Sequence, residues 1–281
     1  MPGLEMTLLI SKQRMVTKLS YAKVRLLGTG TSTGVPVIDC SCPTCTSTNP
    51  KDNRLRCAAY LEVDGTHILI DVGPDFRQQA LRYAIPDIDA VLITHHHFDH
   101  VSGMDDLRPY LFKNRTSIPC HAVKGSADEV RSMFSYIFRD GTYPGVPRLH
   151  MHDVTGPFDV QSRSKEEAPV RVIPIPAVHG SLDVLGYRVG NFAYMTDVSE
   201  IPFASRSLLE GLEVLVLDGL RDKPHPMHLT IDQSIQLATE IGAKQTWFTH
   251  IAHDLTHSEI ELRMPEGMAP AYDGLECTVS L

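Results

Sequence analysis

The sequence predicts an α/β protein (α+β in some schemes) in which two β-sheets pack face to face and helices cover their outer surfaces, a four-layer αββα sandwich. Three observations carry this prediction. Apolar, β-branched runs come in clusters, helical spacing of apolar residues follows each cluster, and this order occurs in both halves of the chain. A doubly wound sheet would instead alternate strands and helices one by one. No linker divides residues 21–281, so we expect them to form one domain.

Five strands and two helices are expected in the first half. The strands are Tyr21–Leu27, Ala58–Val63, His67–Asp71, Ala90–Thr94 and Ile118–Val123, and the helices are Asp75–Ala84 and Ser126–Phe138. Asp64-Gly65 between two of the strands is a hairpin signal. Apolar residues recur at helical spacing in the second helix.

The second half repeats this pattern. Strands are expected at Val170–Ile175, Leu185–Val189, Phe192–Thr196, Val214–Asp218 and Thr246–Thr249, and an amphipathic helix at Thr230–Ile241. Residues 139–168 are rich in Gly, Pro, Ser and charge and show little periodicity. We interpret them as an extended loop or hairpin that covers one face.

Composition limits the partners. The chain has 281 residues, 42% of them hydrophobic, and a formal net charge of -8. Binding nucleic acid without sequence preference needs a basic surface, so this charge argues against it. A small anionic substrate stays compatible, because bound divalent cations reverse the local field. No apolar run reaches the length of a membrane span. We expect a small-molecule substrate, no membrane and no nucleic acid.

The first twenty residues are basic, with Lys12, Arg14 and Lys18, and Leu8–Ile10 is too short for the core of a signal peptide. We expect residues 1–20 to form a disordered N-terminal extension. A transit peptide and an upstream start are the alternatives.

Half of the six cysteines fall within one short stretch, at Cys40, Cys42 and Cys45. A disulfide framework spreads its cysteines to close long loops, whereas these stand at C-x-C-x₂-C spacing. Structural zinc takes four nitrogen or sulfur ligands. We therefore expect a structural zinc with a fourth ligand from elsewhere, in a reducing, cytoplasmic compartment. A reduced cluster without metal is the alternative.

Residues 95–100 read His-His-His-Phe-Asp-His, directly after the strand expected at Ala90–Thr94. Alternate side chains of a strand that runs into a tight loop point the same way. His95 and His97 can therefore bind one metal ion, and Asp99 and His100 can face a second. A polar loop without metal is the alternative, but four ligand-type residues in six favour the metal site.

This stretch is the H-x-H-x-D-H signature, and the chain resembles the metallo-β-lactamase fold family over about residues 21–260. Three further ligand types follow hydrophobic strands in the order that the resemblance implies: His179, Asp197 and His250. The resemblance implies two divalent ions, Mn²⁺ or Zn²⁺. The first would be held by His95, His97 and His179, the second by Asp99, His100 and His250, and Asp197 would bridge them. It also gives Asp71 the role of orienting ligands, and it leaves His96 unassigned.

The three-cysteine loop indicates a particular branch of this family. It follows Gly28-Thr29-Gly30-Thr31-Ser32 and is combined with the dinuclear set and a T-H-x-x-H segment that ends in His253. This combination looks like the PhnP-type phosphodiesterases, which act on phosphoribosyl 1,2-cyclic phosphate, and their relatives. His253 is then the fourth zinc ligand, with His257 and Cys57 as alternatives. Lactam hydrolysis is not expected, because the Cys ligand common among those enzymes is missing near Asp197.

The resemblance assigns catalytic roles to His228 and Asp99, and to His228 substrate binding as well. Cleavage of a phosphodiester must protonate a leaving alkoxide, which a histidine near the metals can do. His228 also precedes the helix expected at Thr230–Ile241, whose N-terminus offers donors to phosphate. His225 competes with His228 for this role.

Three other histidines and one arginine give weaker indications of a functional role. We interpret His121, His150 and His152 as core or loop histidines. Arg108 either lies near the substrate or pairs with the acidic residues before it.

We therefore expect a dinuclear metal-dependent phosphodiesterase that hydrolyses a small cyclic or nucleotide-like phosphodiester through a hydroxide bridging the metals. One alternative is a tRNA 3′-processing-type nuclease of the same fold, although the acidic chain lacks the basic RNA-clamping arm of such enzymes. The other is a catalytically silent, metal-stabilised binding protein. The resemblance is also compatible with a homodimer.

Overall fold

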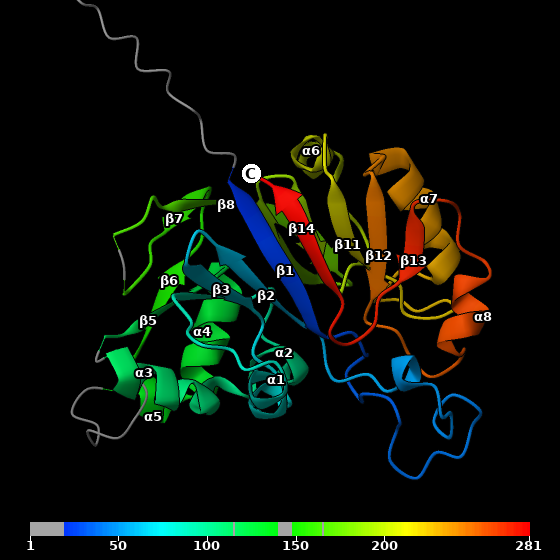
Figure 1. Cartoon of the computed structure of the whole chain (residues 1–281), viewed down its shortest axis with the longest axis horizontal. Coiled ribbons are helices and arrows are strands. Elements are labelled where there is room, and N and C mark those ends of the chain that lie inside the picture. The colour runs from blue at the N-terminus through cyan, green and yellow to red at the C-terminus, as the bar shows by residue number, and fades with distance from the viewer. Residues whose placement is uncertain (1–19, 115, 140–147, 165) are drawn as a thin grey trace, which may run out of the picture.

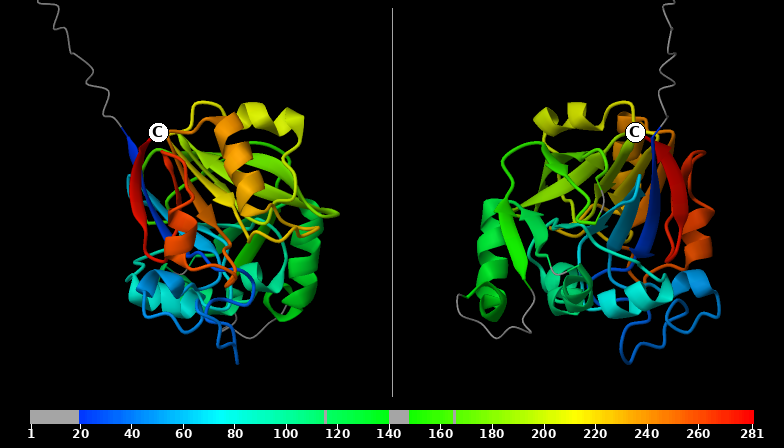
Figure 2. Two further views of the ribbon diagram at one scale, coloured as in Figure 1. Left: turned by 90° about the vertical axis from the view of Figure 1, so that its right-hand side faces the viewer. Right: turned by 60° about the vertical axis from the view of Figure 1, so that its left-hand side comes forward.

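A computed structural model describes residues 20–114, 116–139, 148–164 and 166–281, so the expected N-terminal extension lies outside the described residues except for Ser20. Two seven-stranded sheets pack face to face with helices on their outer sides (Figures 1 and 2), which confirms the αββα sandwich. Within the described ranges, no helix combines the length and the apolar character needed to cross a membrane.

The first sheet has the strand order β14–β1–β2–β3–β4–β5–β6. Its strands are β1 (Tyr21–Gly28), β2 (Ala58–Val63), β3 (Thr66–Ile70), β4 (Ala90–Leu92), β5 (Ile118–Ala122), β6 (Leu149–Asp153) and β14 (Glu276–Ser280). Strands β3 to β6 run parallel. Their carboxyl ends therefore meet at one edge of the sheet.

The second sheet has the order β13–β12–β11–β10–β9–β8–β7. Its strands are β7 (Phe158–Val160), β8 (Val170–His179), β9 (Leu182–Val189), β10 (Phe192–Met195), β11 (Val214–Asp218), β12 (Gln245–Thr249) and β13 (Met268–Pro270). Strands β10 to β13 are parallel. All strands expected from the sequence are present, and β8 and β9 are longer than expected.

The helices are short. They are α1 (Phe76–Arg82), α2 (Phe98–Val101), α3 (Arg108–Asn114), α4 (Lys124–Met133), α5 (Ser135–Phe138), α6 (Phe203–Arg206), α7 (Ile231–Ile241) and α8 (His257–Glu261), with 3₁₀ turns η1 (Pro50–Asp52), η2 (Met104–Leu107) and η3 (Ser207–Leu209). The single helix expected at Ser126–Phe138 is divided at Phe134, which ends α4 and precedes α5. A capping box of Thr230 and Gln233 sets the start of α7 and so the position of the loop before it.

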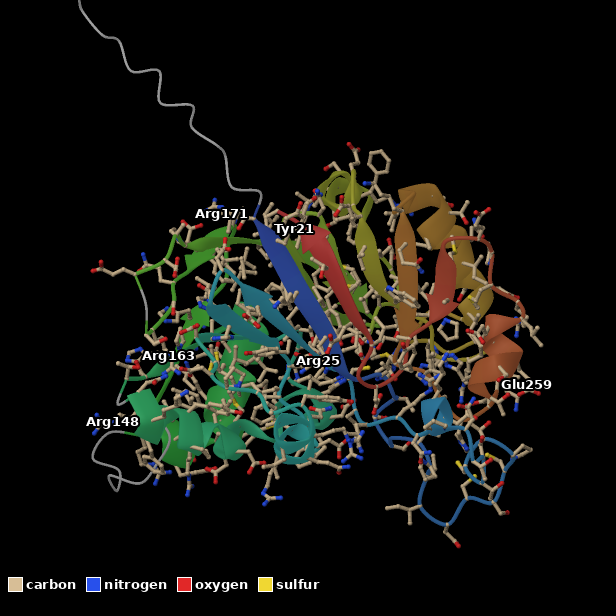
Figure 3. The ribbon with its side chains drawn as sticks, viewed as in Figure 1. Tyr21, Arg25, Arg148, Arg163, Arg171 and Glu259 are labelled. Carbon is tan, nitrogen blue, oxygen red and sulfur yellow. The ribbon has the colours of Figure 1, made fainter. Side chains whose placement is uncertain are left out.

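The expectation for residues 139–168 is wrong in its described part. Strands β6 and β7 occupy it, and they join different sheets instead of forming a hairpin with each other. Leu149 packs under the helices that cover the first sheet, and Val160 lies in the core between the sheets. Arg163, on the flank in Figure 3, ties the chain after β7 to the first sheet through Asp87, at 3.0 Å. These contacts are distant in sequence, so local periodicity does not reveal them.

Tyr187 joins the two sheets directly below the expected metal site. Its fully buried side chain projects from β9, and its hydroxyl donates to the carbonyl of Ile93 at 2.8 Å and lies 3.1 Å from that of His121. The backbone N–H of Leu185 donates to Thr94 at 3.0 Å. Both contacts hold the second sheet against the residues that lead into the histidine cluster.

Replacing Tyr187 by Phe should lower the free energy of unfolding by about 1–3 kcal/mol, because a buried carbonyl loses its donor. Urea denaturation measures the change. Tyr136→Phe is the matched control, since that hydroxyl bonds to Asp105 on the surface. Equal stability of Tyr187→Phe and wild type would show that this contact does not join the sheets.

Candidate metal centre

The site is built where strands of both sheets end. β3 leads to Asp71, β4 to the 95–100 cluster, β8 ends in His179, β10 leads to Asp197 and β12 to His250. Asp71, Asp197 and His250 have φ values of 62°, 54° and 60°, a left-handed backbone that ordinary residues rarely adopt. Such strain persists at functional sites where the surrounding structure imposes it. It turns these side chains toward one another.

The ligand-type side chains form two groups that share one carboxylate. The first consists of His95, His97, His179 and Asp197, and the second of Asp99, His100, Asp197 and His250. Within each group the ligand atoms all lie within 4.8 Å of one another. The structure therefore brings together all seven residues that the resemblance names as ligands.

Asp197 lies at the centre of these groups. Its carboxylate oxygens are 3.8 Å from His95 Nε2, 3.3 Å from His100 Nε2 and 3.4 Å from His250 Nε2. These three nitrogens are buried, and none has a hydrogen-bond partner among the described residues. Buried nitrogen atoms without partners are costly unless an ion coordinates them. The donor set thus fits divalent cations.

Contacts of the Nδ1 atoms determine that the Nε2 atoms of two histidines, His179 and His100, face the centre of the site. His179 Nδ1 donates to the carbonyl of Met227 at 2.7 Å, and His100 Nδ1 lies 2.8 Å from the buried carboxylate of Asp71. Because each Nδ1 carries the proton, each Nε2 keeps its lone pair for a metal. Asp71 thus takes the orienting position expected for it.

The buried carboxylate of Asp197 needs positive charge close to it. Burial opposes ionisation of Asp197, but the imidazoles of His250 and His100 outweigh it and hold the pKa of that carboxyl well below its usual range. Burial lowers the pKa of His95 far below the usual histidine value, with His100 adding to the effect. Burial opposes protonation of His100 and His250, but the carboxylates around them raise the pKa of both rings. Without a metal these two rings therefore carry the positive charge, and a divalent cation would take over that role by displacing their protons.

His228 packs against two of the expected ligands. Its ring is stacked on His250 with centroids 4.7 Å apart and meets His179 edge-on at 4.6 Å. His225 lies one ring further out, 5.1 Å from His228. Of the two histidines left open by the sequence, His228 is therefore the one in contact with the centre.

Asp218 was missed in the sequence and is completely buried. One of its carboxylate oxygens is 3.3 Å from His228 Nδ1, and the other is 3.7 Å from His250 Nδ1. The carboxylate thus hydrogen-bonds the ring of His228 and lies against the ring of His250, whose Nδ1 makes no hydrogen bond within the described residues. The signal was present, because Asp218 ends an apolar strand in the same way that Asp197 follows one.

The three-cysteine loop closes on His253. The Nδ1 atom of His253 lies 3.4 Å from each Sγ atom of Cys40, Cys42 and Cys45. The alternatives lie elsewhere: His257 contacts Arg54, and Cys57 bonds to Gly30 and Thr249. Three cysteine sulfurs and one imidazole nitrogen at this separation suit a closed tetrahedral zinc site.

The remaining candidates lie outside these groups. His96 contacts Ser126 of α4 at 3.1 Å, and Arg108 pairs with Asp105 at 2.7 Å. His121 is stacked between His152 and Phe158, and burial lowers its pKa to about 4. His150 is exposed on β6. We therefore interpret Arg108 and these histidines as residues that support the fold and do not belong to the metal centre.

Comparison with known proteins agrees with this fold. The family model described as "Beta-lactamase superfamily domain" matches residues 66–251. The crystal structure of a diphosphatase from the PhnP family is 42% identical, with a TM-score of 0.85, and covers 94% of this chain and 99% of that one.

Two curated relatives add partial matches. An octanoyltransferase of Porphyromonas gingivalis is 39% identical over 259 residues, which are 90% of this chain and 51% of that protein. The chain thus spans about half the length of that relative. A ribonuclease Z of Methanopyrus kandleri is 40% identical over 57 residues, 20% of each chain. Taken with the fold, the family match shows that the chain is a hydrolase of the metallo-β-lactamase superfamily, and it is similar to a PhnP-family diphosphatase.

Proposed function

We propose that the chain is a dinuclear metal-dependent phosphodiesterase that hydrolyses a small cyclic or nucleotide-like phosphodiester. The observation that carries the proposal is the position of His228, which stacks on His250 beside two donor groups that share Asp197. Two divalent ions, Mn²⁺ or Zn²⁺, suit these nitrogen and oxygen donors. When bound, they would supply an activated water and neutralise charge on the phosphoryl group.

The protein's own residues supply the rest of the reaction. Attack of water on phosphorus breaks one P–O bond, and the leaving oxygen needs a proton. With Nδ1 held by Asp218, the Nε2 atom of His228 is the one free to donate that proton. Asp218 orients the ring of His228. Asp99, which would bind one of the metals, lies beside His100 and His250.

A diphosphate is the second candidate substrate. The PhnP-family diphosphatase is similar over nearly its whole length. Hydrolysis of a P–O–P bond uses the same donors and the same proton transfer, with phosphate as the leaving group. A panel of cyclic sugar phosphates, nucleoside cyclic phosphates, dinucleotides and diphosphate diesters separates the two candidates.

The charge distribution disfavours a nuclease. Three of the four arginines labelled in Figure 3 are neutralised by acidic neighbours: Arg25 pairs with Glu276, Arg163 with Asp87, and Arg171 with Asp159. Paired cations release few counterions from RNA. A tRNA substrate would require salt-sensitive RNA binding.

Hydrolysis of bis(p-nitrophenyl) phosphate in the presence of Mn²⁺ or Zn²⁺ tests the proposal. Asp197→Ala should abolish turnover because both donor groups lose their shared ligand. His228→Ala should lower kcat for a cyclic sugar phosphate, whose leaving alkoxide needs a proton, by about 10²- to 10⁴-fold, the usual contribution of a general acid. The loss should be smaller for bis(p-nitrophenyl) phosphate, because p-nitrophenolate leaves without a proton. His225→Ala is the matched control and should change kcat little. Failure of the wild type to turn over this substrate with any divalent metal would overturn the proposal.

The proposal includes one structural Zn²⁺ on Cys40, Cys42, Cys45 and His253. His253→Ala should remove one equivalent of zinc, measured by elemental analysis, and lower the Tm, because binding energy at such a site is folding energy. His257→Ala should keep the full zinc content. Loss of zinc from the His257 variant instead of the His253 variant would contradict this ligand set.

A further inference from the structure

A cavity of about 480 Å³ lies on the flank of the sandwich, outside the residues that hold the metal centre. Its walls are the turn Val154–Pro157 between β6 and β7, strands β8 and β9, and Leu208 of η3. This volume is within the usual range of small-ligand sites.

The lining is aliphatic. It includes Val123, Pro174 and Leu185, and Asp183 is its single charged side chain within the described chain. Without a cation, the cavity does not favour a phosphoryl group. Burial of hydrocarbon is the main stabilisation that such walls offer.

The cavity lies along an unpaired edge of β8. Strand β7 pairs with Val170–Val172, and among the described residues the stretch 173–177 of β8 pairs with β9 alone. Val178, further along, forms a bridge to Glu200. Pro174 and Pro176 stand on that free stretch at alternate positions. They lack the N–H groups that an added strand would need, so the edge disfavours an extended peptide.

The register places the cavity beside the metal centre. Ala177, in its wall, precedes His179 on β8 by two residues, a rise of roughly 7 Å. Leu185, also in its wall, donates its N–H to Thr94, the residue before His95. Val123 follows β5 at the edge where β4 leads to His95. The cavity and the donor groups thus share strand β8 and the residues that lead into His95.

We propose that this cavity is a subsite for an uncharged aliphatic group of the substrate. The inference rests on the proposed phosphodiesterase function: the phosphodiester lies at the metal ligands, and a chain attached through one ester oxygen extends along β8 into the cavity. Among small cyclic or nucleotide-like phosphodiesters, those that carry an aliphatic group are therefore the preferred substrates.

Alkyl p-nitrophenyl phosphates with methyl, butyl and hexyl groups test the subsite, with release of p-nitrophenolate as the readout. All three share the same leaving group, so chain length alone varies. In the holoenzyme, kcat/KM should rise with chain length, by up to about fourfold for each methylene that becomes buried.

Two variants from different elements locate the effect. Val154→Asp and Leu208→Asp should each remove most of the gain of hexyl over methyl, because a carboxylate replaces part of the apolar wall. Leu262→Asp is the matched control: Leu262 is 88% exposed and lies outside the cavity, so the chain-length dependence should persist.

Equal kcat/KM for the methyl and hexyl esters in the wild type would overturn the subsite while the proposed phosphodiesterase function stands. A chain-length dependence that survives in both cavity variants would also overturn it. Absence of turnover for every ester, including methyl, would instead contradict the phosphodiesterase function itself.

Discussion

The burial of Asp197 is the constraint on which the rest of the site depends. This carboxylate is 2% exposed, and removing a carboxylate from water costs several kcal/mol unless positive charge or donors surround it. The first sheet supplies His95 and His100, and the second supplies His179 and His250. Neither sheet alone could surround this carboxylate, so the face-to-face packing and the shared edge are requirements of the site.

Two further buried carboxylates contact the histidine rings from the side that faces away from Asp197. Asp71 holds the ring of His100, and Asp218 lies against both His228 and His250. Each presents an acceptor to the Nδ1 side of a ring and so leaves Nε2 directed inward. The ring orientation at the centre is therefore set by strand ends of both sheets before any ligand binds.

The charged donor groups and the apolar cavity lie in different parts of the molecule. The edge of the sandwich gathers imidazoles and carboxylates, whereas the flank along β8 offers proline and aliphatic side chains. The long strand β8 connects the two, since it ends in His179 and carries the cavity wall at Pro176 and Ala177. One strand thus contributes to both the donor groups and the cavity.

The sequence by itself determined the sandwich, nearly all core strands and the residue types at the strand ends. Apolar, β-branched runs and the ligand-type residues that follow them are local signals, and they indicated His95, His179 and Asp197. Tertiary structure decided what depends on contacts between distant segments. It brings His253 rather than His257 to the cysteines, places Asp218 behind two rings, and sends β6 and β7 to different sheets. Such choices depend on which chain ends meet in space, and no local pattern records that.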